Sequence, residues 1–450
     1  MNKMDQFLFI FQHLDIKAAQ PSPNQWQHWF ARMVARDYSP WIDENHQNMK
    51  KQLLIIGGGF AGFWSAISAI RQSREIGKAD EVEITLVNAD NYFTIRPRLY
   101  EVSLDGLQIQ LAKYLQPLGI RQVTGTAKII NPEKNEVVVL TAGGIKSLHY
   151  DYLILATGGA LKEINLPGIQ YTHNIDTYDN AQRLEDHLAK LSRHNFRGEG
   201  SATFVVAGAG LTGLETVTSI EEKARAIQAR HGGKRTHFRI VLIDREEKLG
   251  SCYPLEGQQY IRKACAEKNI EVITGAEIKA IAPTRIVLNN GNTISTRTVI
   301  WTIGMMASSL TQFFAGEKDQ LNRLKVDNYL KLPGYNNVIV SGDVANVSVD
   351  NGHTAVMACQ YAQVMGRWSG HNAINDLFSL PLKEYVHNNY FTVLDLGEGH
   401  ALFTKGWDRS VQQYGTEARD LKKRINTLHI YPMEDVEDTV KASCPETPEF

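Results

Sequence analysis

Gly57-Gly58-Gly59-Phe60-Ala61-Gly62 follows the apolar run Leu53–Ile56, and Gly208-Ala209-Gly210-Leu211-Thr212-Gly213 follows a second apolar run, Phe204–Val206. Both stretches fit the pattern G-x-G-x-x-G. Its first glycine allows a tight turn after a strand, its second lets the backbone approach a ligand, and its third lets the next helix pack close to the strand. The two stretches therefore predict two strand–turn–helix units in one chain.

This turn holds the pyrophosphate of a dinucleotide at the N-terminus of the helix. A single match also occurs as an ordinary glycine turn of an α/β domain, so one copy alone would be weak evidence. Two copies in the same context favour two nucleotide sites. We expect a chain that holds two dinucleotides to move electrons between them.

The composition bounds the class of protein. The chain has 450 residues, of which 43% are hydrophobic and 22% charged, and these values are typical of a globular protein with two or three domains. A formal net charge of −1 gives no electrostatic reason to expect nucleic acid as a partner. The four cysteines lack C-x-x-C spacing, so neither a zinc site nor a disulfide framework is predicted. No apolar run reaches about 18 residues, which argues against a spanning helix.

The order of strands and helices predicts that the second unit is inserted in the first. The strand ending in Ala156-Thr157-Gly158-Gly159 belongs to the first unit, and the chain returns to it through the strand that ends in Gly342-Asp343. A helix is expected over about 354–377. The fold class is α/β with two Rossmann-like domains and a smaller mixed C-terminal region. The expected segments are an N-terminal extension at 1–48, the first domain at 49–160 and 298–380, the inserted domain at 161–297, and the C-terminal region at 381–450. Within the extension, residues 26–34 have the spacing of a short amphipathic helix.

Four signatures in order resemble a known superfamily. GGGFAG (57–62), ATGG (156–159), GAGLTG (208–213) and SGDVA (341–345) are similar to those of the two-dinucleotide-binding-domain flavoproteins, over about residues 50–378. The stretches GLTGLE (210–215), WTIG (301–304) and ACQYAQ (358–363) are most similar to type II NADH:quinone oxidoreductases and related FAD-containing NADH dehydrogenases. The resemblance implies an oxidoreductase that takes hydride from NADH onto FAD and gives the electrons to a quinone-type acceptor.

The resemblance also implies roles for residues. The first glycine turn would hold the FAD pyrophosphate, and Asp343 would accept hydrogen bonds from the FAD ribityl region. The second turn would hold NADH, with Glu215 beside the nicotinamide and Gln360 at the quinone. The expected cofactor contacts are Gly57, Gly59, Phe60, Ala61, Gly62, Asn88, Arg96, Pro97, Ala127, Thr157, Gly158, Gly208, Gly210, Gly213, Asp244, Gly304, Asp343, Val344 and Ala362.

The chain departs from the family pattern at three places. The end of the second strand carries Asn88 in place of the usual acid, although Asp90 can substitute for it. Asp244 favours NADH over NADPH because a carboxylate repels the 2′-phosphate, while the neighbouring Arg245 leaves NADPH open. The quinone pattern A-Q-x-A-x-Q is kept only at Gln360 and Ala362, with Cys359 and Val364 at the other two positions.

Missing cysteines limit the chemistry. Disulfide reductases of this superfamily need a cysteine pair after the second strand, and residues 90–105 contain none. Sulfide:quinone oxidoreductases also need a pair near the flavin, where only Cys359 is expected. The open alternatives to a quinone acceptor are a protein acceptor such as a ferredoxin, and an NADH-sensing flavoprotein resembling apoptosis factors.

The pattern that suggests contact with a membrane lies in residues 415–430. Ala418, Leu421, Ile425 and Leu428 form an apolar stripe, and Lys422, Lys423 and Arg424 lie on the other face. Such a segment either lies at a membrane surface or docks on the protein itself. The sequence thus predicts a cytoplasmic protein, with peripheral contact with the inner membrane and homodimer formation both left open.

Overall fold

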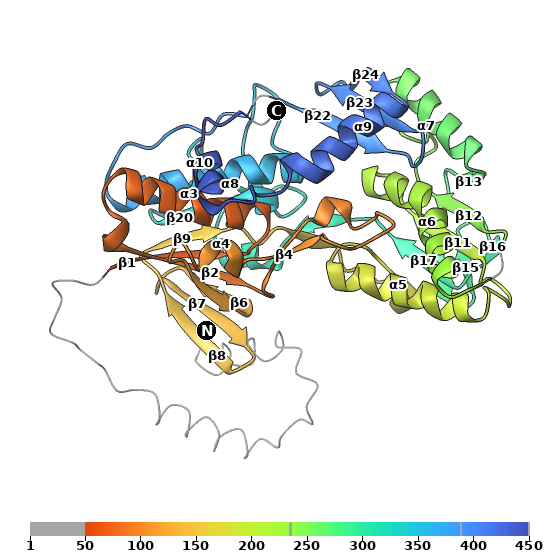
Figure 1. Cartoon of the computed structure of the whole chain (residues 1–450), viewed down its shortest axis with the longest axis horizontal. Helices are drawn as coiled ribbons and strands as arrows, with labels where there is room; N and C mark the ends of the chain where they lie inside the picture. Colours follow the sequence, from red (N-terminus) through yellow and green to blue (C-terminus); the bar gives the residue numbers. More distant parts are fainter. Residues whose placement is uncertain (1–49, 234–235, 388, 449–450) are drawn as a thin grey trace, which may run out of the picture.

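The computed structural model describes residues 50–233, 236–387 and 389–448 (Figure 1). The expected extension at 1–48 and its helix at 26–34 lie outside the described residues.

The first unit is built on a five-stranded parallel sheet in the order β20-β9-β1-β2-β5. The strands are β1 (Lys51–Ile56), β2 (Val82–Asn88), β5 (Arg121–Thr124), β9 (Tyr152–Leu155) and β20 (Val338–Val340). Leu53–Ile56 is buried, as expected for a central strand covered on both faces. Because β20 pairs with β9, the chain returns to the first sheet after the inserted unit.

Two helices cover one face of this sheet, and an antiparallel insert lies on the other side (Figure 1). The helices are α3 (Phe60–Glu75) and α8 (Cys359–Leu377), and the insert is β6 (Thr126–Asn131), β7 (Glu136–Thr141) and β8 (Gly144–His149). The helix expected from residue 354 begins only at Cys359, since Ala358 has extended backbone angles. Residues 356–358 instead precede the helix and line the cavity described below.

Glycines bring α3 and α8 into close contact. A Cβ at Gly366 would overlap the Ala61 carbonyl oxygen, and a Cβ at Gly370 would overlap that of Ser65. The crossing therefore depends on residues without a side chain. It holds the first turn of α8 next to the first glycine turn of the chain.

The second unit carries a four-stranded parallel sheet in the order β13-β12-β11-β17. Its strands are β11 (Thr203–Ala207), β12 (Arg239–Ile243), β13 (Ile270–Ile273) and β17 (Thr298–Trp301), and its helices are α5 (Tyr178–Arg193), α6 (Leu211–Arg230) and α7 (Leu255–Glu267). An antiparallel sheet of β14 (Ile278–Ala282), β15 (Arg285–Leu288) and β16 (Thr293–Ser295) adjoins it. β17 lies just beyond the 161–297 range expected for this unit, yet it pairs with β11.

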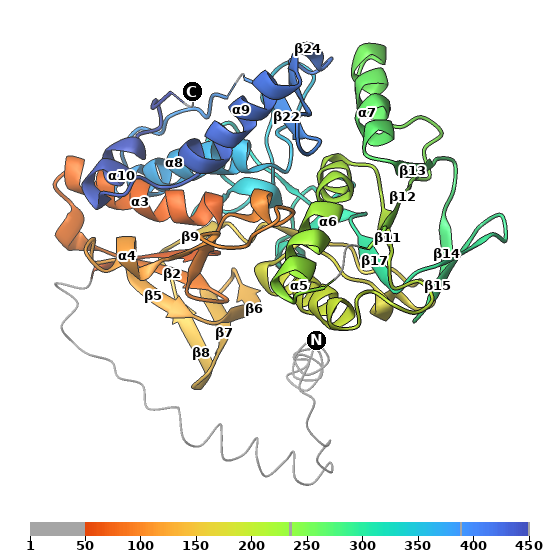
Figure 2. The same ribbon diagram turned by 45° about the vertical axis from the view of Figure 1, so that its right-hand side comes forward.

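Two short strands join the units. β10 (Gly159–Leu161) leaves the first unit and β18 (Met305–Ala307) returns to it, and they pair antiparallel. The two units lie side by side (Figure 2). The remaining short elements are η1 (Ala79–Glu81), β3 (Tyr92–Thr94), η2 (Arg96–Arg98), β4 (Gln108–Gln110), α4 (Ala112–Leu115), η3 (Ile169–Tyr171), η4 (Ser309–Phe313), β19 (Leu324–Lys325), η5 (Gly342–Val344) and β21 (Ala345–Asn346).

The C-terminal region first covers the second unit and then crosses back to the first. It contains the antiparallel sheet β22 (Phe391–Asp395), β23 (Ala401–Lys405) and β24 (Ser410–Tyr414), then α9 (Thr416–Arg424), the π-helical turn η6 (Ile425–His429) and α10 (Val436–Ala442). α10 lies against α3, where Arg74 and Glu437 form an ion pair of 3.0 Å. Within the described ranges no helix is long and apolar enough to cross a bilayer.

Candidate functional site

The first glycine turn has the geometry of a phosphate-binding turn. Gly57 has φ +107°, and its N–H donates to Val87 O at 2.8 Å. A Cβ at Gly62 would overlap the Gly57 carbonyl oxygen, so the helix can pack on the turn only with glycine there. Gly59 ends the turn as the N-cap of α3, with open space beside it. The first N–H groups of α3 therefore face that space.

Asn88 closes this turn at the end of β2. Its Oδ1 accepts from the N–H of Gly58 at 2.9 Å, and its Nδ2 donates to Asp90 Oδ1 at 3.1 Å. The amide thus links the turn to the only carboxylate in the 88–92 stretch. The link places Asp90 beside the turn, where it also lines the cavity described below.

The second glycine turn repeats the first. Gly208 has φ +102°, its N–H donates to Ile243 O at 2.8 Å, and a Cβ at Gly213 would overlap the Gly208 carbonyl oxygen. Here a carboxylate closes the turn, since Asp244 Oδ2 accepts from the N–H of Ala209. Asp244 Oδ1 accepts from the N–H of Glu246 at 2.8 Å, so both oxygens hold loop backbone.

One cavity of about 880 Å³ extends from Gly58 and Gly59 of the first turn to Leu211 and Thr212 at the start of α6. This volume lies in the range of small-molecule and cofactor sites. Among the expected site residues, the cavity is lined by Gly59, Phe60, Ala61, Asn88, Arg96, Pro97, Gly158, Glu215, Asp343, Gln360 and Ala362. The other expected residues, which lie outside its lining, are Gly57, Gly62, Ala127, Thr157, Val344, Gly208, Gly210, Gly213, Asp244 and Gly304.

Arg96 and Asp343 form the charged part of the wall near the first turn. Arg96 Nη1 lies 3.9 Å from Asp343 Oδ2, and the same guanidinium pairs with Asp176. Burial raises the pKa of Asp343, and the charge of Arg96 opposes that rise. Asp343 lies in the short turn η5 (Gly342–Val344), which follows β20 and places this residue at the cavity.

The start of α8 forms the next part of the wall. Cys359, Gln360, Ala362 and Gln363 line the cavity. Burial raises the pKa of the Cys359 thiol to about 11, which keeps it protonated at neutral pH. Gln360 Nε2 donates to Asn389 O at 3.1 Å, so this side chain is anchored to the C-terminal region. All four cysteines are free.

Glu215, which the sequence predicted as a site residue, lies in a buried ionic cluster whose other members the sequence did not predict. Its Oε1 is 2.8 Å from Lys422 Nζ, and it also accepts from the N–H of Asp395 at 3.3 Å. Burial raises the pKa of Glu215, and the charge of Lys422 opposes that rise. Burial lowers the pKa of Lys422, but the Glu215 carboxylate outweighs it and the net direction is upward. We therefore assign the pair as a carboxylate and an ammonium ion.

The cluster corrects the expectation for residues 415–430. Lys422 was expected on the polar outer face, yet its ammonium is buried against Glu215. Ala418 is also buried, whereas Leu428 at the end of the stripe is 63% exposed. The helical period predicted on which face of α9 Lys422 and the apolar stripe lie. It gave no information on which part of the protein α9 packs against. The part of the segment around Ala418 and Lys422 therefore packs on the protein, whereas Leu428 faces solvent.

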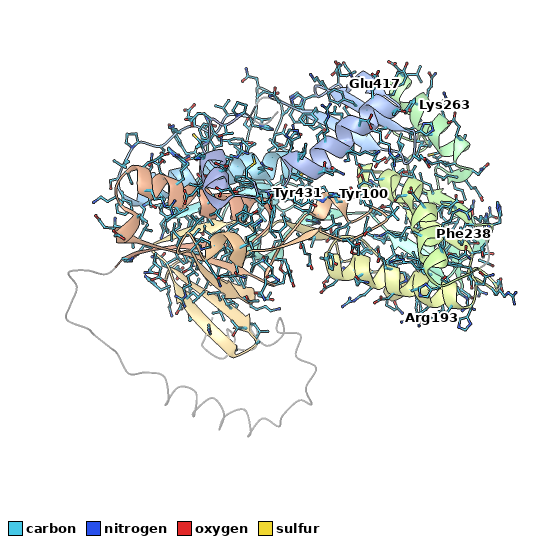
Figure 3. All side chains as sticks on the ribbon, viewed as in Figure 1. Tyr100, Arg193, Phe238, Lys263, Glu417 and Tyr431 are labelled. Atoms are coloured by element: carbon cyan, nitrogen blue, oxygen red, sulfur yellow. The ribbon has the colours of Figure 1, made fainter. Side chains whose placement is uncertain are left out.

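Tyr100 and Tyr431 lie in the middle of the molecule, where the two units and the C-terminal segment meet (Figure 3). The Tyr100 hydroxyl donates to Asp395 Oδ2 at 3.2 Å, and Arg98 Nη1 donates to the Tyr431 hydroxyl at 2.7 Å. These bonds tie the 96–100 segment of the first unit to the C-terminal region. No group of three or more His, Cys, Asp and Glu side chains in the described ranges has an arrangement that could hold a metal ion.

Comparison with known proteins is consistent with this geometry. The sequence profile described as pyridine nucleotide-disulphide oxidoreductase matches residues 51–366. The NADH dehydrogenase-like protein MT1860 of Mycobacterium tuberculosis is 38% identical over 383 residues, which cover 85% of this chain and 94% of that protein. The type II NADH:quinone oxidoreductase of Staphylococcus saprophyticus is 23% identical, covering 85% and 96%. Among solved structures, NDH2 of Plasmodium falciparum superposes with a TM-score of 0.67 at 14% identity, covering 89% of this chain and 100% of that one.

Proposed function

The chain belongs to the pyridine nucleotide-disulphide oxidoreductase family, and we propose that this oxidoreductase is an FAD-dependent NADH dehydrogenase with a quinone-type acceptor. The observation that carries the proposal is a cavity that is lined by the first glycine turn and by the start of α6, the helix that follows a second turn of the same geometry. Two nucleotides bound at these turns would meet between Asp343, the start of α8 and Glu215.

The residues near the first turn fit FAD. Gly59 leaves open space at the N-terminus of α3, where the pyrophosphate would lie. Among the described residues, the buried hydroxyl of Thr157 has no hydrogen-bond partner, and a ligand that approaches the Ala156–Gly158 turn would supply one. Bound FAD would supply the two-electron chemistry between NADH and the acceptor.

The chain's own residues would bind and orient. Asp343 would accept from the hydroxyls of a ribityl chain, and Arg96 would hold that carboxylate through their ion pair. The N-terminus of α8 would favour negative charge at the end of the ring that it faces. The N-terminus of α6 would hold the NADH pyrophosphate, while Glu215 would orient the nicotinamide from a position that Lys422 fixes.

The acceptor would approach at the start of α8. Gln360 presents its amide at the cavity, and its bond to Asn389 O keeps the side chain in place. Support for a quinone also comes from the relative of Staphylococcus saprophyticus, which is a type II NADH:quinone oxidoreductase. A quinone in a bilayer would require contact with a membrane surface, and we propose that the enzyme works as a peripheral protein at the cytoplasmic face.

Spectroscopy and turnover test the proposal together. The purified protein should show flavin absorbance bands that bleach on anaerobic titration with NADH. It should then oxidise NADH continuously when a water-soluble ubiquinone or menaquinone analogue is added. A folded protein that holds no flavin contradicts the whole proposal. Bleaching without turnover on quinones contradicts the acceptor alone, and turnover restricted to a protein acceptor would identify a ferredoxin-type reductase.

A further inference from the structure

Arg409 lines the cavity from the turn between β23 and β24. Its Nη1 donates to Cys252 Sγ at 3.0 Å and its Nη2 donates to the Tyr390 hydroxyl at 2.8 Å. The guanidinium also lies over the ring of Tyr253, with Cζ 4.8 Å from the ring centre. In the described part of the chain, none of its contacts is a carboxylate.

The other cations of this cavity are neutralised. Arg96 is paired with Asp176 and Asp343, and Lys422 is paired with Glu215. Asp408, next to Arg409 in the chain, turns its carboxylate to the Ser410 hydroxyl at 2.6 Å. A half-buried guanidinium without a counter-ion favours an anionic ligand, and it has five N–H donors, of which the described partners use two.

A stack of aromatic rings holds this wall in place. Tyr390 stacks on Trp407 with centroids 4.3 Å apart, and Trp407 stacks on His353 at the same separation. Trp407 Nε1 donates to Asp350 Oδ2 at 2.9 Å. His353 and Asp350 belong to the first unit, so the hairpin that carries Arg409 is fixed against it.

The wall adjoins the acceptor end of the cavity. Gln360 at the start of α8 donates to the carbonyl of Asn389, and Tyr390 is the next residue. The pyrophosphate positions lie instead at the two glycine turns, whose N–H groups already suit phosphate. The guanidinium without a counter-ion therefore lies at the end of the cavity where, under the proposed function, the ring of the acceptor would bind.

We propose that Arg409 and Tyr390 form an acceptor subsite that selects small quinone-type rings carrying a negatively charged substituent, such as a sulfonate, a carboxylate or an ionised ring hydroxyl. The inference rests on the proposed function and adds the class of acceptor. The reaction remains NADH + H⁺ + quinone → NAD⁺ + quinol, and the anionic substituent is unchanged.

The test compares two naphthoquinones as acceptors for the flavin-loaded full-length protein. One is 1,4-naphthoquinone-2-sulfonate, which is anionic, and the other is menadione, which is neutral. We expect Arg409→Met to lower the ratio of kcat/KM for the sulfonate to kcat/KM for menadione by about tenfold, because one charge-assisted contact is lost. The change should appear in KM for the sulfonate, and Arg409→Lys should restore part of it.

Lys405→Met is the matched control. Lys405 lies on the same hairpin, is exposed and does not line the cavity, so its loss changes the net charge equally and should leave the ratio unchanged. An unchanged ratio in Arg409→Met overturns the inference, as does a rise in KM for NADH alone. If the wild-type protein reduces neither quinone, binding of the sulfonate is measured from the perturbation of the flavin spectrum. Weaker binding to Arg409→Met would then uphold the subsite although the quinone function had failed, and equal binding would overturn both.

Discussion

The two glycine turns share their backbone and differ in their surroundings. Gly57 and Gly208 have φ values of +107° and +102°, and a Cβ at Gly62 or Gly213 would overlap the corresponding carbonyl oxygen. The first turn is closed by the amide of Asn88, the second by the carboxylate of Asp244. α3 is buried at every position from Phe60 to Ser73 under its neighbours, whereas α6 has several partly exposed positions. The two turns therefore differ in their surroundings and not in their backbone. Under the proposed function, these surroundings would distinguish the resident nucleotide from the exchanging one.

The largest expected effect comes from adding one methyl group to each turn. Gly62→Ala should yield a protein with little or no flavin, with affinity at least about 100-fold weaker, since α3 must shift inside a packed core. Gly213→Ala should keep the flavin and raise KM for NADH at least about tenfold. Flavin content is read from absorbance after denaturation, and KM from steady-state kinetics.

Gly352→Ala is the control, because a Cβ there meets no atom within 4 Å. Loss of flavin in Gly213→Ala, with flavin kept in Gly62→Ala, would reverse the assignment of the two turns.

The next effect concerns the buried ion pair of Glu215 and Lys422. Lys422→Met should lower the free energy of unfolding by about 3 kcal/mol, because Glu215 would remain buried without its cation. Adding Glu215→Gln should recover most of this loss, as the double variant buries no unpaired charge. Urea denaturation of the four proteins gives the coupling energy. Lys423→Met, at the exposed neighbouring position, is the control and should have a free energy of unfolding close to that of the wild type. If the losses of the two single variants simply add in the double variant, Glu215 and Lys422 are not coupled.

Exchanging the closing groups of the turns should give smaller changes. Asp244→Asn removes the charge that repels a 2′-phosphate, so the ratio of kcat/KM for NADPH to that for NADH should rise about tenfold. Asn88→Asp places a carboxylate 3.1 Å from the Asp90 oxygen that now accepts from its amide, and flavin affinity should fall about threefold. Both follow from steady-state kinetics and flavin-release titrations. A change of nucleotide preference in Asn88→Asp would show that the two turns are not independent.

The smallest expected effect is on the stability of the fold at acid pH. Each unit contains a buried histidine whose protonation would destabilise it. Burial lowers the pKa of His187 in α5 and of His371 in α8 to about 4. An unfolded histidine has a pKa of about 6.5, so between these values the unfolded chain binds more protons and the free energy of unfolding falls as the pH drops. The midpoint of thermal unfolding should therefore fall by a few °C from pH 6.5 to pH 4.5.

His187→Gln should flatten this pH dependence for the second unit, and His371→Gln for the first. Amide hydrogen exchange, resolved by peptide, distinguishes the units. A slope that stays the same in both variants would assign the acid sensitivity to other groups.

Local sterics explain what was predictable. The strands before both glycine turns, the return of the chain at Gly342-Asp343 and the insertion of the second unit followed from apolar runs and glycines a few residues apart. The start of α8 was misplaced because nothing in the sequence of residues 354–358 stops a helix, whereas in the structure Thr354 bridges to Ser348 and the helix begins only at Cys359. Lys422 and Arg409 were not predicted as site residues, because their partners Glu215 and Cys252 are far away in the chain. The periodicity of a helix or strand gives no information on contacts between distant segments.

The order of strands in the first sheet has a consequence for biosynthesis. Its central strand β1 lies between β2 and β9, but β9 is completed on its other edge only by β20 at Val338–Val340. The second unit spans its whole sheet between Thr203 and Trp301. During translation, the second unit can thus complete its sheet first. The first unit, although its synthesis begins earlier, can complete its sheet only when β20 has been made, more than a hundred residues after β11. An emerging chain can thus complete the sheet that precedes the second glycine turn before the sheet that precedes the first.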